Sequence, residues 1–208
     1  MMAIAMTPAF PRSRGTAREA AQPPPLDASV LARCRAQEPM AFRAFVVRYE
    51  RMVFALLSRM MGQDARAEVE DLAQETFVRA YRAFPDFDPN GAAKPSTWLL
   101  TIATRLALDA KKKKSVVDPR AGDEAAAAVA GHSTPELTLE RRQLGQALAE
   151  AAASLPDDQR AALVLAEVHG LSIAEIAGAL EVPENTAKTR LFRAREKMRE
   201  AMNDWRAP

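Results

Sequence analysis

The chain has 208 residues, and 29 Lys or Arg against 27 Asp or Glu give it a formal net charge of only +2. This balance, with 48% hydrophobic residues, excludes a uniformly basic nucleic-acid coat and a disordered polyelectrolyte. The single cysteine excludes an internal disulfide, and two histidines without a C-x-x-C motif argue against a structural zinc. No stretch has the roughly 18 apolar residues of a membrane span or the pattern of a signal peptide. We therefore expect a cytoplasmic protein that does not insert into membranes.

The N-terminal 27 residues contain five prolines, three of them consecutive at positions 23 to 25. Proline removes backbone donors from helix interiors, so we expect residues 1–27 to be a disordered extension. The rest of the chain is rich in Ala, Leu, Glu and Arg and has few β-branched runs. These residues favour helix, and we expect an all-α protein.

Three stretches of the N-terminal half repeat apolar residues at steps of three and four, the period of an amphipathic helix. They cover residues 40–60, 69–84 and 96–106. Gly62 and Pro85 end the first two helices, and the hydroxyl of Ser96 can cap the third. The pattern predicts a helical bundle over residues 28–114.

Residues 115–138 lose this periodicity and contain Gly, Pro, Ser and a run of four alanines, a composition typical of a flexible linker. Residues 139–154 again have a helical pattern. Pro156 and the two following acids then predict the first turn of another helix, which runs to Gly170. We expect a second, wholly helical domain over residues 139–202, followed by a short tail at 203–208.

The most specific local pattern begins at Ser172, which forms a Ser-x-x-Glu capping box with Glu175. Pro183 interrupts the short helix that follows and suits the first turn of the next one. From Lys188 to Arg199 that next helix has six basic residues and one acid, Glu196. This pattern is typical of a helix-turn-helix whose second helix reads a DNA major groove. The alternative is a basic surface helix in an ordinary αα-hairpin.

The first domain has opposite charges on two helices. Its second helix is acidic, with Asp64, Glu68, Glu70, Asp71 and Glu75, and the end of its third helix is basic, with Arg105 and Lys111 to Lys114. This separation suggests two partners, although basic residues at a helix C-terminus also favour the helix dipole. Trp98 could stack on an unpaired base, but its place on the apolar stripe favours a core role.

At these positions the chain resembles the extracytoplasmic-function group of sigma-70-type sigma factors, the promoter-recognition subunits of bacterial RNA polymerase. Residues 71–77 look like region 2.2 of that family, and residues 96–109 look like regions 2.3 and 2.4. Residues 155–195 are similar to region 4. Both blocks occur in the family's order, with no region 3 domain between them.

The resemblance implies a role for each block. Contact with the clamp helices of the polymerase β′ subunit is carried over to Asp71, Gln74, Glu75 and Phe77. Recognition of the −10 element is carried over to Asn90, Lys94, Ser96, Thr104, Arg105, Lys111 and Lys112. Recognition of the −35 element is carried over to Glu184, Asn185, Thr186, Lys188, Thr189, Arg190, Phe192 and Arg193. Family members commonly have Asn at position 105, so the Arg found here leaves the −10 base preference undefined by the resemblance.

We therefore expect a sigma factor that binds core RNA polymerase, including the β flap, recognises both promoter elements and aids melting. The resemblance also implies an anti-sigma factor as a partner. The alternatives are a stand-alone helix-turn-helix regulator and a sigma mimic that sequesters an anti-sigma factor. We expect no enzymatic activity, catalytic residue, metal or cofactor, because no phosphate loop, nucleophile elbow or metal-ligand spacing occurs.

Overall fold

The computed structural model describes residues 26–62, 65–89, 91, 93–117, 145 and 147–206. Within these ranges the secondary structure is helical, with no strand. The expectation of an all-α protein is therefore confirmed. Of the predicted extension (1–27) and linker (115–138), residues 1–25 and 118–138 lie outside the described ranges. The linker boundary at residue 115 is wrong, because residues 115–117 continue the last turn of the helix over Pro95–Val117.

The N-terminal half contains four α-helices and a 3-10 turn among its described residues. They are α1 (Ala28–Arg35), α2 (Pro39–Met61), α3 (Arg66–Ala83), η3 (Phe84–Asp86) and α4 (Pro95–Val117). Gly62 ends α2 with a φ of 92°, a left-handed conformation that glycine adopts without strain. The third predicted helix begins one residue earlier than expected, because Pro95 suits the first helical position. Ser96 therefore lies inside the first turn of α4.

The C-terminal half has a helical segment over residues 147–153, then α6 (Asp157–Glu167), α7 (Ile173–Leu180) and α8 (Glu184–Arg206). Helix α6 ends three residues before the predicted stop at Gly170. The chain turns at Gly170, whose φ is 70°. The first-turn acids Asp157 and Asp158 lie where the helix dipole favours negative charge, as the sequence predicts.

An aromatic cluster fills the N-terminal bundle. The Phe45 and Phe84 rings lie with their centroids 5.0 Å apart, and the Trp98 ring lies 5.3 Å from Phe84 and 4.8 Å from Phe87. Phe45 and Phe84 are fully buried, whereas Trp98 is half-buried against them. These contacts give Trp98 the core role that its place on the apolar stripe favours.

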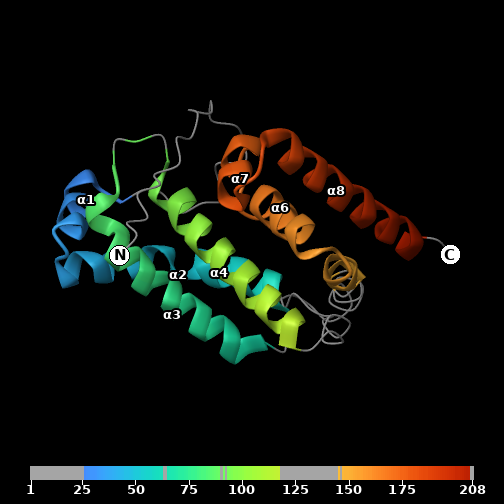
Figure 1. The fold of residues 1–208 in the computed structure, drawn as a ribbon, viewed down its shortest axis with the longest axis horizontal. Coiled ribbons are helices and arrows are strands. Elements are labelled where there is room, and N and C mark those ends of the chain that lie inside the picture. The colour runs from blue at the N-terminus through green and yellow to red at the C-terminus, as the bar shows by residue number, and fades with distance from the viewer. Residues whose placement is uncertain are drawn as a thin grey trace, which may run out of the picture.

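The two halves pack against each other through α4 and α2. Helix α4 contacts α2 and α3 on one side and α6 and α7 on the other, and α2 also contacts α6. Figure 1 shows α4 crossing the centre of the molecule, with α6, α7 and α8 grouped along one side of it. The buried apolar residues of both halves form one continuous core. The relative placement of the functional surfaces therefore depends on this contact.

Candidate functional site

The helix-turn-helix forms where the sequence predicts it. The Ser172 hydroxyl accepts the Glu175 backbone N–H at 3.3 Å, and Glu175 accepts the Ser172 N–H at 2.8 Å, which completes the capping box. Glu181 then ends α7 in a left-handed conformation with a φ of 54°. The chain turns through Val182 and Pro183 into α8. The turn thus orients α8 relative to α7.

Helix α8 has one face packed on the rest of the C-terminal half and one face in solvent. Ala187, Leu191 and Ala194 are buried, and α8 contacts α6 and α7. The apolar side chains fix the helix and leave its polar residues outward.

The residues assigned by resemblance to −35 recognition lie mostly on the outward face of α8. Exposed among them are Glu184, Asn185, Lys188, Thr189, Phe192 and Arg193, and Thr186 is half-buried. Phe192 is 62% exposed. Arg190 differs from the others, because its guanidinium forms a 2.7 Å ion pair with Asp158 of α6. The outward face is therefore basic and has one large apolar side chain near its middle.

The residues assigned to −10 recognition are divided between exposed and covered positions. Lys94 and Lys112 are exposed, whereas Ser96 and Thr104 are buried. Arg105 and Lys111 are half-buried and contact the C-terminal half. Asn90 lies outside the described residues. Arg105 of α4 thus pairs with Glu181 at the end of α7, and Lys111 pairs with Asp157 at the start of α6.

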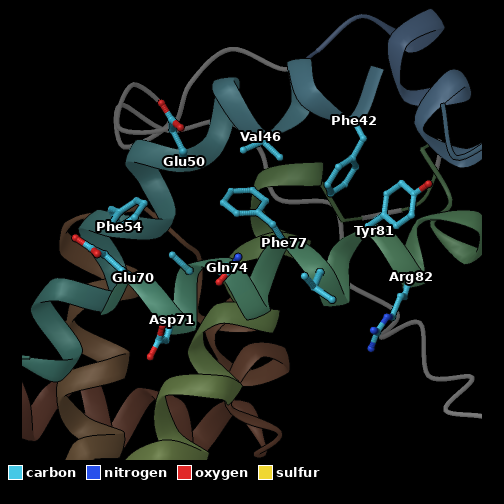
Figure 2. Close-up of a pocket in the computed structure, with 12 residues that line it drawn as sticks. Phe42, Val46, Glu50, Phe54, Glu70, Asp71, Gln74, Phe77, Tyr81 and Arg82 are labelled. Atoms are coloured by element: carbon cyan, nitrogen blue, oxygen red, sulfur yellow. The ribbon is translucent and has the colours of Figure 1, made fainter. Parts of the chain in front are cut away.

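A groove between α2 and α3 contains most of the residues assigned to polymerase binding. It has a volume of about 870 Å³, and Asp71, Gln74 and Phe77 line it. Figure 2 shows Phe77 of α3 pointing towards Val46 of α2 in the middle of the groove, with Glu70 and Asp71 towards one end. Glu75 does not line the groove and pairs with Arg79 at 2.7 Å. The groove is apolar along its floor and acidic at that end.

Sequence reasoning missed two features. Phe54 lines the groove and is 38% exposed. The sequence could have indicated it, because it is an apolar residue that lies outside the buried stripe of α2. Arg160 is buried, and its guanidinium donates to the carbonyl oxygens of Ala152 at 2.8 Å and Met60 at 3.1 Å. No sequence pattern pointed to Arg160, because its partners are backbone carbonyls, and one of them, that of Met60, is 100 residues away in the chain.

The reactive side chains of the described region are buried. Cys34 is fully buried, and burial raises the pKa of its thiol. Burial and the nearby charge of Arg59 lower the pKa of His169 to about 4. Among the described residues, no group of three or more His, Cys, Asp or Glu could hold a metal ion. No described helix is long and apolar enough to cross a membrane.

The sequence of this chain matches known protein families over both halves. Residues 45–116 match the sigma-70 region 2 family, and residues 145–198 match the sigma-70 region 4 family. Over 172 residues the chain is 37% identical to the ECF RNA polymerase sigma factor SigW of Bacillus subtilis, covering 79% of this chain and 90% of SigW. The chain belongs to the ECF sigma factors. The ECF RNA polymerase sigma-E factor of Escherichia coli K12 is 34% identical over 178 residues, covering 82% of this chain and 91% of that protein.

Two solved structures have a fold similar to that of this chain. The structure of CnrH in complex with the cytosolic domain of CnrY matches with a TM-score of 0.59 and 26% identity, covering 86% of this ECF sigma factor and 97% of CnrH. The sigma factor RpoE of Bartonella quintana, in complex with the anti-sigma factor NepR, matches with a TM-score of 0.62 and 23% identity, covering 78% and 96%. In this ECF sigma factor, α2, α3 and α4 thus belong to region 2, and α6, α7 and α8 to region 4.

Proposed function

We propose that this ECF sigma factor binds core RNA polymerase through the groove between α2 and α3 and reads the −35 element with the outward face of α8. The supporting observation is that the two surfaces differ in chemistry. The groove is apolar with an acidic end, whereas the face of α8 is basic. One surface suits a protein helix and the other suits DNA.

The outward face of α8 has the side chains that major-groove recognition needs. Lys188 and Arg193 are exposed cations that can bond phosphates or guanine edges. Thr189 and Phe192 can contact thymine methyl groups. Glu184, Asn185 and Thr186 occupy the first turn, which approaches DNA first when a recognition helix enters by its N-terminal end.

The groove suits a partner helix that has apolar and basic side chains. Phe77 and Val46 provide an apolar floor, and Glu70 and Asp71 provide negative charge. The family resemblance identifies that partner as the β′ clamp helices, with the β flap as a second polymerase contact. We assign Asp71, Gln74 and Phe77 to direct contact, and Glu75 to the rim through its pair with Arg79.

Region 2 would then read the −10 element with α4 and the segment before it. We assign Asn90, Lys94, Ser96, Thr104, Arg105, Lys111 and Lys112 to this role. Holding an unstacked base in a protein pocket lowers the cost of strand opening. The covalent connection between the two halves would let two weak DNA modules act together, because tethering raises their effective concentration.

The remaining assignments follow from the same proposal. Residues 28–114 and 139–202 are the two working domains, and the protein acts in the cytoplasm without covalent chemistry. Among the similar solved structures, the sigma factor RpoE of Bartonella quintana is in complex with the anti-sigma factor NepR. By analogy, we propose that an anti-sigma factor binds this chain and controls its access to polymerase.

In vitro transcription with purified core RNA polymerase tests the proposal. Promoter-specific transcripts should appear only when this protein is added. The variant Arg193→Glu should abolish them, because it puts a negative charge against the DNA backbone while leaving the groove intact. A stand-alone regulator would bind its site without core polymerase, and a sigma mimic would be unaffected by the substitution. The proposal would be contradicted if adding the protein to core polymerase produced no promoter-specific transcript on any of several promoters.

A further inference from the structure

The solvent face of α2 has a row of apolar side chains. Within the described ranges, four large apolar side chains are exposed, and three of them, Met40, Val47 and Phe54, lie on α2. They follow one another at intervals of seven residues, which is two helical turns less about 20°, so they project from the same side of the helix. Met40 is 67% exposed and Val47 is 64% exposed. Apolar exposure in this part of the chain is thus concentrated in one row.

The positions between these three residues extend the row into a seam with alternating steps of four and three residues. All members of the seam are exposed, and they are Met40, Ala44, Val47, Arg51, Phe54 and Ser58. Alternating steps of three and four residues are the spacing with which one helix packs along another. From residue 40 to residue 58 the seam is about 27 Å long at 1.5 Å per residue. Its spacing and length therefore suit a single partner helix.

The seam is distinct from the two surfaces of α2 that already have a role. Phe45 and Tyr49 are fully buried in the bundle, on the opposite side of the helix. Figure 2 shows Val46 pointing into the groove towards α3, whereas the next residue, Val47, does not line the groove. Phe54 belongs to both the seam and the groove, and it marks the end of the seam that approaches α3. Most of the seam therefore faces solvent without a neighbouring element.

The charge beside the seam is basic. Arg43 and Arg48 flank it on its two sides, Arg51 lies within it, and all three side chains are exposed. None of the three side chains forms a hydrogen bond or ion pair with another described residue. Between residues 40 and 58 the one acid is Glu50, which is half-buried and lines the groove. Opposite charge on a partner would therefore favour acidic side chains beside its apolar row.

Three other occupants suit this surface less well. A second copy of the chain would bring the arginines of one seam against those of the other. A flat anionic lipid surface or DNA would meet Glu70 and Asp71, which are exposed on the adjacent helix α3. Phosphate groups would also leave the apolar row without a partner. A helix is only about 10 Å wide, so it can cover the seam without covering α3.

We propose that the seam of α2 is a docking site for an amphipathic helix of a partner protein, with apolar side chains along its contact row and Asp or Glu on both sides. Met40 and Val47 are the apolar anchors, and Arg43 and Arg48 pair with the flanking acids. Neither anchor is assigned to polymerase or to DNA. The site thus adds a protein partner beyond those of the proposed function.

Two synthetic peptides of three heptads test the seam with the full-length protein. Both have Leu at the two core positions of every heptad, and the flanking positions are Glu in one peptide and Lys in the other. Like charges at these positions keep each peptide from self-associating. A hydrocarbon staple on the outer face holds both peptides helical, which lowers the entropy cost of binding. Fluorescence anisotropy should show saturable binding of the Glu peptide, at least tenfold tighter than that of the Lys peptide.

Three variants locate the bound peptide. Val47→Asp should weaken binding of the Glu peptide at least tenfold, because it puts a charge into the apolar contact. Phe192→Asp is the matched control, because Phe192 is exposed on α8, and it should change this affinity less than twofold. The double variant Arg43→Glu, Arg48→Glu should reverse the preference in favour of the Lys peptide. All these positions are exposed, so thermal melts of the variants should agree within a few degrees.

The proposal is overturned if the wild-type protein shows no saturable binding of the Glu peptide, or if Val47→Asp binds it equally well. Phosphatidylglycerol vesicles and a duplex DNA of unrelated sequence are tested in parallel. If Val47→Asp weakened binding to either of these but not to the Glu peptide, the seam would be a lipid or DNA contact instead. In vitro transcription separates these results from the proposed function, because Val47→Asp should give promoter-specific transcripts at the wild-type level. Loss of those transcripts would make the seam a polymerase contact and would also overturn the proposal.

Discussion

His169 shows how one buried residue makes folding depend on pH. Its side chain is 2% exposed in the turn after α6, and its pKa falls from 6.5 to about 4 through burial and the charge of Arg59. The folded protein therefore keeps this imidazole neutral where the unfolded chain protonates it. Stability from this group is complete above pH 6.5 and is lost as the pH falls towards 4.

We predict that the free energy of unfolding falls by about 3 kcal/mol between pH 6.5 and pH 4 because of His169 alone. Chemical denaturation at several pH values measures this slope. The variant His169→Gln should be less stable at neutral pH but should lose the slope between pH 6.5 and 5, where few carboxylates titrate. Equal slopes for the two proteins in that interval would show that another group is responsible.

Arg160 connects the two halves through backbone atoms. Its guanidinium donates to carbonyl oxygens of residues 152, 153 and 155, and reaches the carbonyl of Met60 near the end of α2. Burial lowers its pKa, and the neighbouring Asp157 opposes this effect. Helix ends that meet inside a protein need such a donor, because their last carbonyls have no helical partner.

Replacing this side chain should be severely destabilising. We predict that Arg160→Met lowers the free energy of unfolding by about 3 to 5 kcal/mol, because several buried carbonyls lose their partner. Urea denaturation measures the loss. Arg193→Met removes an exposed arginine and should change stability by no more than about 0.5 kcal/mol. Similar small losses in both variants would mean that water satisfies the carbonyls as well as Arg160 does.

At the scale of the element, α2 has two different apolar surfaces. Its buried stripe includes Phe45, Tyr49 and Val53 and holds the bundle together. Val47 and Phe54 lie outside this stripe and are 64% and 38% exposed, but only Phe54 lines the groove with α3. This difference provides a matched pair of apolar residues on the same helix.

We predict that Phe54→Asp weakens binding to core polymerase at least tenfold, because it puts a desolvated charge into an apolar contact. Val47→Asp introduces the same charge at an exposed position of α2 outside the groove, and it should change the affinity for core polymerase less than threefold. Fluorescence anisotropy of labelled protein with core polymerase measures both. Thermal melts of the two variants should agree within a few degrees, so that a folding defect is excluded. An equal loss in both would place the polymerase contact elsewhere on α2.

At the scale of the whole molecule, the net charge of +2 is small because acidic and basic regions of the surface cancel each other. The groove is acidic at one end, the outward face of α8 is basic, and Arg105 and Lys111 face the acids Glu181 and Asp157 across the contact between the halves. The buried core continues through this contact. Region 2 and region 4 therefore behave as one body in the structure, although the chain between them has the composition of a linker.

We predict that the halves stay together after the connecting chain is cut. A protease site placed between residues 125 and 130 would give two fragments, which should co-elute on size exclusion because α4 and α2 pack on α6 and α7. Adding Glu181→Arg should shift the elution towards separate fragments, whereas Glu38→Arg should not. Separate elution of the unmodified fragments would show that the packing needs the covalent connection.

The sequence by itself determined the helices and the character of their surfaces. Periodicity located α2 and α3, the capping box located α7, and the lopsided charge of α8 identified an outward basic face. These features are local, because a helix reveals its buried side through a repeat of three to four residues. The family resemblance rested on the same short motifs.

Only the tertiary structure decided what covers each surface. The family resemblance assigned Arg105 and Lys111 to DNA, and the folded chain pairs them with Glu181 and Asp157 of the C-terminal half. The bonds of Arg160 to distant carbonyls, the burial of His169 and the place of Phe54 in the groove were equally invisible. Each depends on residues far apart in the chain or on backbone atoms that every residue has. No periodicity records such contacts, so they appear only when the helices are packed.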